Sequence, residues 1–432
     1  MIKNLKKKNK LILCFAVIVS GLILYASDDQ NVIAHIIALL VLTSTACTLE
    51  KADIYHPYVW FSTFFWVYSC AYPILYLTGY STDYGYTKEI MVYQWVALST
   101  ILMVLPANKV VFFKSSNVTA RNDKVLVFTE NVVLIYIVIV IALILRGSYQ
   151  NKTAIYASEN VLFTIAFSAA YFAILIYCYI IFGKLNKFHN RKCYGSIIKS
   201  GFVICLFAII TGERDYMFSF ILVTLVILFY YRIISKKQLF CLIPVGIVLI
   251  PISSMFKYFI LSGNISGTFT LENLLVEVLD SEFISAGRNL QILVLHDCKN
   301  FWAGKTIIND FVRIFYDTGY SNQTWFNQTF FSSSHSTQYG FTLVGEGYVN
   351  GGVFGIIVVF LICGLLLRVL YKNAVKNQFY MIIYLYMIPL FIYSIRADLA
   401  NIFSPLIKYA LLGTGIIWIL HHLVIGKRRK NV

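Results

Sequence analysis

The sequence predicts an all-α protein that crosses a membrane many times. Its mean hydropathy is +0.73, and only 13% of its residues are charged, whereas a soluble chain carries about 25%. A bilayer is spanned by roughly 17–25 apolar residues, and about twelve segments approach or reach that length. They are 11–26, 31–48, 57–78, 89–105, 128–146, 161–182, 197–212, 216–234, 238–260, 343–371, 378–395 and 403–425.

The basic residues predict the orientation of these spans. Most of the 36 Lys and Arg residues fall in connections that share one side, and such connections normally face the cytoplasm. Both termini are then cytoplasmic, because an even number of spans returns the basic tail to the side of the N-terminus. The net charge of +16 thus reflects topology, and we expect no nucleic-acid partner.

The sequence contains no motif for a bound metal or cofactor. None of its nine cysteines forms a CxxC pair, so neither a zinc site nor a disulfide framework is predicted. Walker loops and dinucleotide fingerprints are also missing from the sequence. We therefore expect no metal and no cofactor.

The chain divides into three parts by span placement. Residues 1–260 hold the first nine spans, 261–342 form a large extracytoplasmic loop, and 343–432 hold the last three spans and the basic tail. Apolar residues at helical spacing predict two short loop helices, which would lie on the membrane surface or pack against the bundle. The first run is Leu271, Leu274, Leu275, Val278 and Leu279, and the second is Ile307, Ile308, Phe311, Ile314 and Phe315.

Two short turns between spans each carry an arginine on the predicted outer side. Arg214 lies between Glu213 and Asp215, and Arg396 lies two residues before Asp398. A guanidinium can bind phosphate through two hydrogen bonds, so the two arginines could clamp a diphosphate. The alternative is that each arginine pairs with a neighbouring carboxylate and closes its turn.

Glu346 stands at the beginning of the tenth predicted span. A carboxylate near a helix N-terminus is stabilised by the helix dipole, which alone can explain its position. The functional interpretation is a base, or a group that orients an arginine or a sugar hydroxyl. The Gly347, Gly351 and Gly355 spacing is typical of close helix packing.

His335 is the other candidate base, in the polar part of the loop. Its ordinary pKa near 6.5 suits proton transfer around neutral pH, although a loop histidine is more often simply solvated. Aromatic residues on the same side, among them Tyr348, could stack on sugar rings or simply fill the bundle.

Three short motifs resemble the O-antigen polymerase (Wzy) family. Residues 211–217, Thr-Gly-Glu-Arg-Asp-Tyr-Met, resemble the family's Gly-x-Arg turn. Residues 345–355, Gly-Glu-Gly-Tyr-Val-Asn-Gly-Gly-Val-Phe-Gly, are similar to its segment after the large loop, and Arg396-Ala397-Asp398 resembles its Arg-x-Asp turn. The chain departs from the family pattern at Glu213, where a small residue is common, and at Gly351, where an aromatic often stands.

The resemblance implies a metal-independent membrane glycosyltransferase of GT-C-like fold in the bacterial plasma membrane. Such an enzyme would move a growing glycan from undecaprenyl pyrophosphate to a sugar hydroxyl of the next lipid-linked unit, at the outer face. A chain-length regulator and a flippase are possible partners. On this basis Arg214, Arg396, Asp398, Tyr348 and Asn350 would bind substrate. His335 and Glu346 would be catalytic.

Two other functions stay open at this point. A ligase of O-antigen type would need the same outer loop and cations, but it would move finished glycan to a different acceptor. A flippase of lipid-linked sugars would need polar groups along a path through the membrane midplane. The charges here gather at one face, apart from a few such as Glu130.

Overall fold

The computed structural model is helical throughout the residues that it describes, and those residues contain no β-strand. They are 2–106, 123–147, 160–188, 194–239, 241–242, 276, 278–316, 321–331, 340–374 and 378–419. The chain folds as two units, each assembled from stretches that are far apart in the sequence. Unit 1 comprises 1–111, 271–375 and 391–404, and unit 2 comprises 112–270, 376–390 and 405–432.

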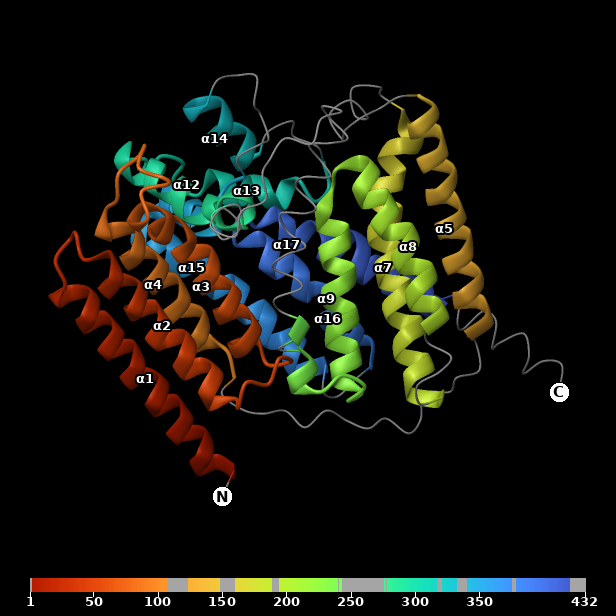
Figure 1. Cartoon of the computed structure of the whole chain (residues 1–432), viewed down its shortest axis with the longest axis horizontal. Helices are drawn as coiled ribbons and strands as arrows, with labels where there is room; N and C mark the ends of the chain where they lie inside the picture. The colour runs from red at the N-terminus through yellow and green to blue at the C-terminus, as the bar shows by residue number, and fades with distance from the viewer. Residues whose placement is uncertain are drawn as a thin grey trace. The chain divides into compact units, whose positions relative to one another are not determined.

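Unit 1 contains four helices that lie side by side, with further helices from the second half of the chain packed against them (Figure 1). The short helices α12, α13 and α14 lie at the end of this unit opposite the N-terminus, which we call the loop end (Figure 1). The elements are α1 (Ile2–Ala26), α2 (Val32–Leu49), α3 (Pro57–Leu77), α4 (Lys88–Val104), the π-helical turn η2 (Leu279–Phe283), α12 (Ile284–Leu295), α13 (Lys305–Val312), α14 (Asn322–Phe330), α15 (Leu343–Ala374) and α17 (Ala400–Pro405).

Unit 2 is a second helical bundle, in which α7 contacts α5, α8, α9 and η4. Its long helices are apolar on nearly all sides, as expected for helices surrounded by lipid and by each other. Its elements are α5 (Asp123–Arg146), α7 (Val161–Phe188), α8 (Tyr194–Thr211), α9 (Arg214–Tyr230), most of α16 (Gln378–Ser394) and η4 (Leu406–Leu411).

The helices support the prediction of a multi-pass membrane protein. Every predicted span overlaps a helix except 238–260, most of which lies outside the described residues, and the last span, 403–425, is described only to residue 419. Among the described residues, seven helices are long and apolar enough to cross a membrane, and the shorter helix Phe379–Ser394 is also apolar. The total of twelve therefore stays a prediction.

The helix α3 forms the centre of unit 1, although it is not among those seven. Its aromatic side chains are buried, and Tyr58, Phe61 and Phe65 have no exposed surface. The helix begins at Pro57, and the preceding His56 accepts the N–H of Tyr58 at 3.1 Å. The packing of α3 against α2, α12 and η2 thus joins the N-terminal bundle to the segment from the large loop.

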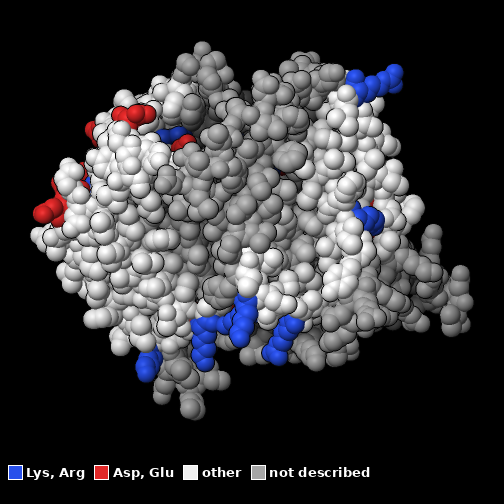
Figure 2. Space-filling view, viewed as in Figure 1, with Lys and Arg blue, Asp and Glu red and all other residues white. Residues whose placement is uncertain are grey.

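Exposed charges differ between the two ends of unit 1. On the face drawn in Figure 2, acidic side chains gather at the upper left, where this unit carries its loop end. The opposite end is basic, since Lys10 donates to the Met103 carbonyl and Arg368 to the Val104 carbonyl, at 3.1 and 3.2 Å. Both cations therefore bind carbonyl groups at the C-terminus of α4. Positive charge stabilises a helix at that end because the helix dipole is negative there.

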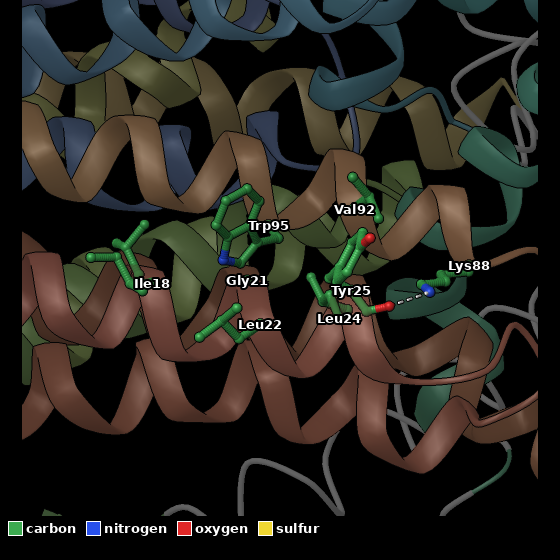
Figure 3. A pocket seen from close by; sticks show the side chains of 9 residues that line it. Ile18, Gly21, Leu22, Leu24, Tyr25, Lys88, Val92 and Trp95 are labelled. Atoms are coloured by element: carbon green, nitrogen blue, oxygen red, sulfur yellow. Dashed lines mark hydrogen bonds between the residues drawn. The ribbon is translucent and has the colours of Figure 1, made fainter.

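An apolar groove of about 440 Å³ lies between α1 and α4 (Figure 3). Trp95 lies across Gly21, where a Cβ atom would come within 2.9 Å of the indole ring. At one end of the groove, Lys88 donates to the Ser27 carbonyl at 2.7 Å (and to that of Tyr25 at 3.5 Å). None of the residues predicted for the functional site lines this groove.

Candidate functional site

The helix α15 is broken near its beginning, within the motif that starts at Gly345. Gly351 and Gly352 leave helical geometry, and Gly352 has a φ of 55°, in the left-handed region that favours glycine. The break divides the helix into a short arm, 343–350, and a long arm, 353–374. Only the long arm continues as an uninterrupted apolar helix.

The two arms cross at very close range. A Cβ atom on Gly347 would lie 2.5 Å from the Cα of Ile356, and one on Gly355 would lie 2.1 Å from the Gly347 carbonyl oxygen. In a straight helix, residues nine apart are about 13.5 Å apart along the axis, so the short arm folds back on the long one. The predicted close packing by glycine therefore occurs between two parts of one helix.

The break leaves carbonyl groups at the end of the short arm without helical partners. The N–H of Asn300 donates to the Tyr348 carbonyl at 3.3 Å, and the N–H of Trp302 to the Val349 carbonyl at 2.8 Å. The side chain of Lys299 lies over the break, because a Cβ atom on Gly352 would be 2.8 Å from the Cε atom of Lys299. The segment before α13 therefore stabilises the broken geometry.

Glu346 is fully buried on the short arm. Its Oε2 accepts the N–H of Leu399 at 2.8 Å, at the beginning of the last candidate span, Ala400–Ile419. Asn350, one helical turn later, donates through Nδ2 to Thr306 on α13 and to the Glu346 carbonyl, at 2.5 and 2.7 Å. The short arm thus connects the turn before α17 with the loop helix α13.

Asp310 and Asp398 complete a carboxylate cluster with Glu346. Arg313 donates through Nη1 to Asp310 and to Asp398, both at 3.3 Å. The second oxygen of Asp310 accepts the N–H of Ala400 at 3.3 Å, and the second oxygen of Asp398 accepts the Asn401 amide at 2.6 Å. Three carboxyl groups therefore meet around one guanidinium and the N-terminal N–H groups of a helix, which favour negative charge.

Burial and the charge of Asp398 raise the pKa of Asp310 to about 7, although Glu346 and Arg313 lower it. Glu346 Oε1 has no hydrogen-bond partner among the described groups, and the Glu346 and Asp310 carboxyls lie close enough to influence each other electrostatically. With a pKa of about 7, Asp310 takes up and releases a proton around neutral pH.

Arg396 lies beside this cluster, on the turn that carries Asp398. Its guanidinium stacks on the Tyr393 ring, 4.8 Å from the ring centre, in a cation–π contact. Its carbonyl accepts the N–H of Phe341 at 3.0 Å, and the Ile395 carbonyl accepts the N–H of Leu343 at 3.2 Å. Two backbone hydrogen bonds therefore join the segment that enters α15 to the turn after α16.

The remaining predicted site residues are Tyr348, Arg214 and His335. Tyr348 is buried, and its ring packs against Tyr93 with centres 5.1 Å apart. Arg214 begins α9 in unit 2, after a turn in which Gly212 has a φ of 71°. His335 lies outside the described residues.

Asp310, Arg313 and Thr306 are the cluster residues that the sequence reasoning missed. They are spaced by four and three residues, which places them on one face of a helix. Asp310 and Arg313 lie within the predicted helix over 307–315, and Thr306 directly precedes it. This spacing could have indicated the cluster from the sequence, because a polar face on an otherwise apolar helix needs a polar neighbour.

These features define a polytopic helical membrane protein with a buried polar cluster at one end of a bundle. The profile of the O-antigen polysaccharide polymerase Wzy family matches residues 10–429, so the chain belongs to that family. Its members are glycosyltransferase-type polymerases that act on lipid-linked oligosaccharide repeat units in membranes. No curated protein and no solved structure matched the chain, and the GT-C-like fold stays a prediction.

Proposed function

We propose that this protein polymerises polysaccharide repeat units at the outer face of a bacterial plasma membrane. The observation that carries the proposal is the family match over residues 10–429. The donor is a glycan on undecaprenyl pyrophosphate, and the acceptor is a sugar hydroxyl of the next lipid-linked unit. A C–O bond forms between the donor's anomeric carbon and the acceptor oxygen. The bond from that carbon to the phosphate oxygen breaks, and the lipid diphosphate leaves with the electron pair.

In this reaction the arginines bind the donor diphosphate, and a base takes the acceptor proton. Arg396 and Arg214 are the proposed diphosphate ligands, because guanidinium groups stabilise charge that grows on a leaving phosphate. His335 is the proposed base. Cationic side chains rather than a metal ion neutralise the leaving group, so a purified enzyme should keep its polymerase activity in excess EDTA.

Glu346 is proposed as a positioning residue for this chemistry. Its hydrogen bond to Leu399 holds the turn that carries Arg396. The proposed substrate site is lined by Asp398, Asn350 and Tyr348. Asp398 connects its turn to Arg313 just after α13, and Asn350 connects the short arm to Thr306 on α13. These contacts support a site that is preorganised by the large loop.

Arg396→Ala and Arg396→Lys test the proposal in a host that makes the matching repeat unit and lacks its own copy of the gene. We expect Ala to abolish the long glycan ladder at normal protein level. Lys, which retains charge but loses the planar fork, should leave shortened chains. An unchanged ladder with Arg396→Ala would remove this residue from diphosphate binding.

The deletion strain itself separates the polymerase from the two alternatives. A polymerase deletion leaves single repeat units on the final acceptor. Loss of a ligase leaves polymer on the carrier lipid, and loss of a flippase leaves lipid-linked units on the cytoplasmic side. Either of the last two patterns would replace the proposed function.

A further inference from the structure

The helix α13 has its polar side turned toward the protein and its apolar side turned outward. Thr306 and Asp310 are buried, each about 1% exposed, and they contact Asn350 and Ala400. Ile308, on the opposite face, is 66% exposed, and Phe315, in the turn just after the helix, is 73% exposed. Positions 308, 311 and 312 follow helical spacing, and Phe315 continues the same apolar stripe in the turn after the helix. Phe311 is 38% exposed, and its ring also packs against Phe403, with the ring centres 4.8 Å apart.

Water is a poor environment for such a stripe. A soluble protein rarely leaves a row of large apolar side chains exposed on one helix, and here the same helix buries a carboxyl group on its other side. An apolar side that faces outward and a polar side that faces the protein are expected where hydrocarbon surrounds the helix and the neighbouring protein interior is polar. The chain belongs to a family of multi-pass membrane proteins, so lipid is available to cover the stripe.

The charges on α13 match the headgroup region of a membrane. Its one acidic residue, Asp310, is buried, while Lys305 at its beginning is exposed. Arg313, just after its end, is 27% exposed. The Arg313 guanidinium is paired with Asp310 and Asp398, whereas the exposed Lys305 lies beside the apolar face, as cations of interfacial helices do at the level of the lipid phosphates.

We propose that α13 is an interfacial helix that binds membrane phospholipid. The acyl chains cover the stripe formed by Ile308, Phe311, Val312 and Phe315, and the Lys305 ammonium binds the phosphate of an anionic headgroup. Because Asp310 is on the opposite face, the same helix that rests on the lipid also holds the carboxylate cluster (α13 in Figure 1). The inference rests on the membrane location of the family and does not require the proposed reaction.

Photo-cross-linking in lipid nanodiscs tests this directly. A benzophenone amino acid replaces Ile308 or Phe315 in the full chain, in nanodiscs of phosphatidylethanolamine and phosphatidylglycerol at three to one. Phe15 on α1, an exposed apolar residue of a candidate span, is the positive control. Asn300, an exposed polar residue on the connection between α12 and α13, is the negative control.

We expect the lipid adduct yield at 308 and 315 to approach that at 15 and to exceed that at 300 severalfold. Yields equal to that at 300, or cross-links to protein alone, would overturn the inference. Phosphatidylglycerol should be enriched in the adducts at 308 beyond its share of the lipid, and Lys305→Gln should remove that enrichment. No enrichment in the parent chain would overturn the assignment of Lys305 to an anionic headgroup.

Discussion

At the residue scale, Glu346 shows how a buried carboxyl group can be accommodated in a membrane protein. A carboxylate at the mouth of a span is costly unless it is paired or hydrogen-bonded. One oxygen of Glu346 satisfies this condition through the Leu399 N–H. The position of Glu346 before a span was visible in the sequence, whereas Leu399 lies 53 residues further along the chain.

Two substitutions at Glu346 test whether its side-chain oxygen accepts the Leu399 N–H. Glu346→Gln keeps an oxygen for the Leu399 N–H, so we expect its unfolding free energy to stay within about 1 kcal/mol of the parent. Glu346→Ala leaves that N–H buried and unpaired, and it should lower the unfolding free energy by about 1–3 kcal/mol. Denaturation of the purified protein in detergent measures both. Equal stability of the two variants would contradict the assigned hydrogen bond.

The Asp310 carboxyl makes stability depend on pH. Its pKa is raised from 3.8 to about 7 in the folded protein, so between these values the folded chain holds a proton that the unfolded chain has released. The unfolding free energy contributed by Asp310 therefore falls as pH rises through this window and is constant above it. Across the whole window, the contribution of Asp310 to the unfolding free energy changes by at most about 4 kcal/mol.

Asp310→Asn checks this effect, because asparagine does not titrate. We expect the decline in melting temperature between pH 5 and pH 8 to be shallower in this variant than in the parent. The Arg313 guanidinium keeps Asp398 as its partner in the variant, so the pairing on that side is preserved. A parent whose melting temperature rises over the same interval would contradict the assigned protonation.

At the element scale, the broken helix α15 decides where the carboxylate cluster forms. The short arm folds back at Gly351 and Gly352, so Glu346 and Asn350 face α13 and the turn before α17. The sequence indicated close packing by glycines but not a fold-back. An apolar stretch interrupted by two glycines is also compatible with one continuous helix.

Alanine substitutions distinguish the glycines that permit this crossing from one that does not. Gly355→Ala places a methyl group 2.1 Å from the Gly347 carbonyl oxygen, and we expect a loss of about 1–3 kcal/mol in unfolding free energy. Gly351→Ala is the matched control, because a Cβ there meets nothing within 4 Å. Thermal unfolding of both variants measures the difference, and a Gly355→Ala protein as stable as Gly351→Ala would rule out the crossing.

At the scale of the whole molecule, the distribution of charge in unit 1 agrees with a defined orientation in the membrane. One end carries Lys10, Arg368 and the exposed Lys51, and the other end carries the exposed acids Asp83 and Asp297. The bias of basic residues toward the cytoplasm predicts that the N-terminus lies inside and that the loop end, with the carboxylate cluster, lies outside.

Labelling of single introduced cysteines in intact cells tests this orientation. A membrane-impermeant maleimide should label Asp83→Cys in intact cells, and Lys8→Cys only after permeabilisation. Both positions are exposed, and the unsubstituted chain gives the background from its own cysteines. The reverse pattern would invert the topology and place the carboxylate cluster on the cytoplasmic side.

Length, hydropathy and the positions of basic residues by themselves determined that this chain is a bundle of membrane-crossing helices with its polar motifs at helix ends. These are local properties, and a bilayer imposes the same requirement on every span, so sequence is enough to recognise them. Only the tertiary structure decided that Asp310 and Arg313 join Glu346 and Asp398. That meeting depends on two glycines folding a helix back on itself, and on contacts between segments tens of residues apart, which no local pattern specifies.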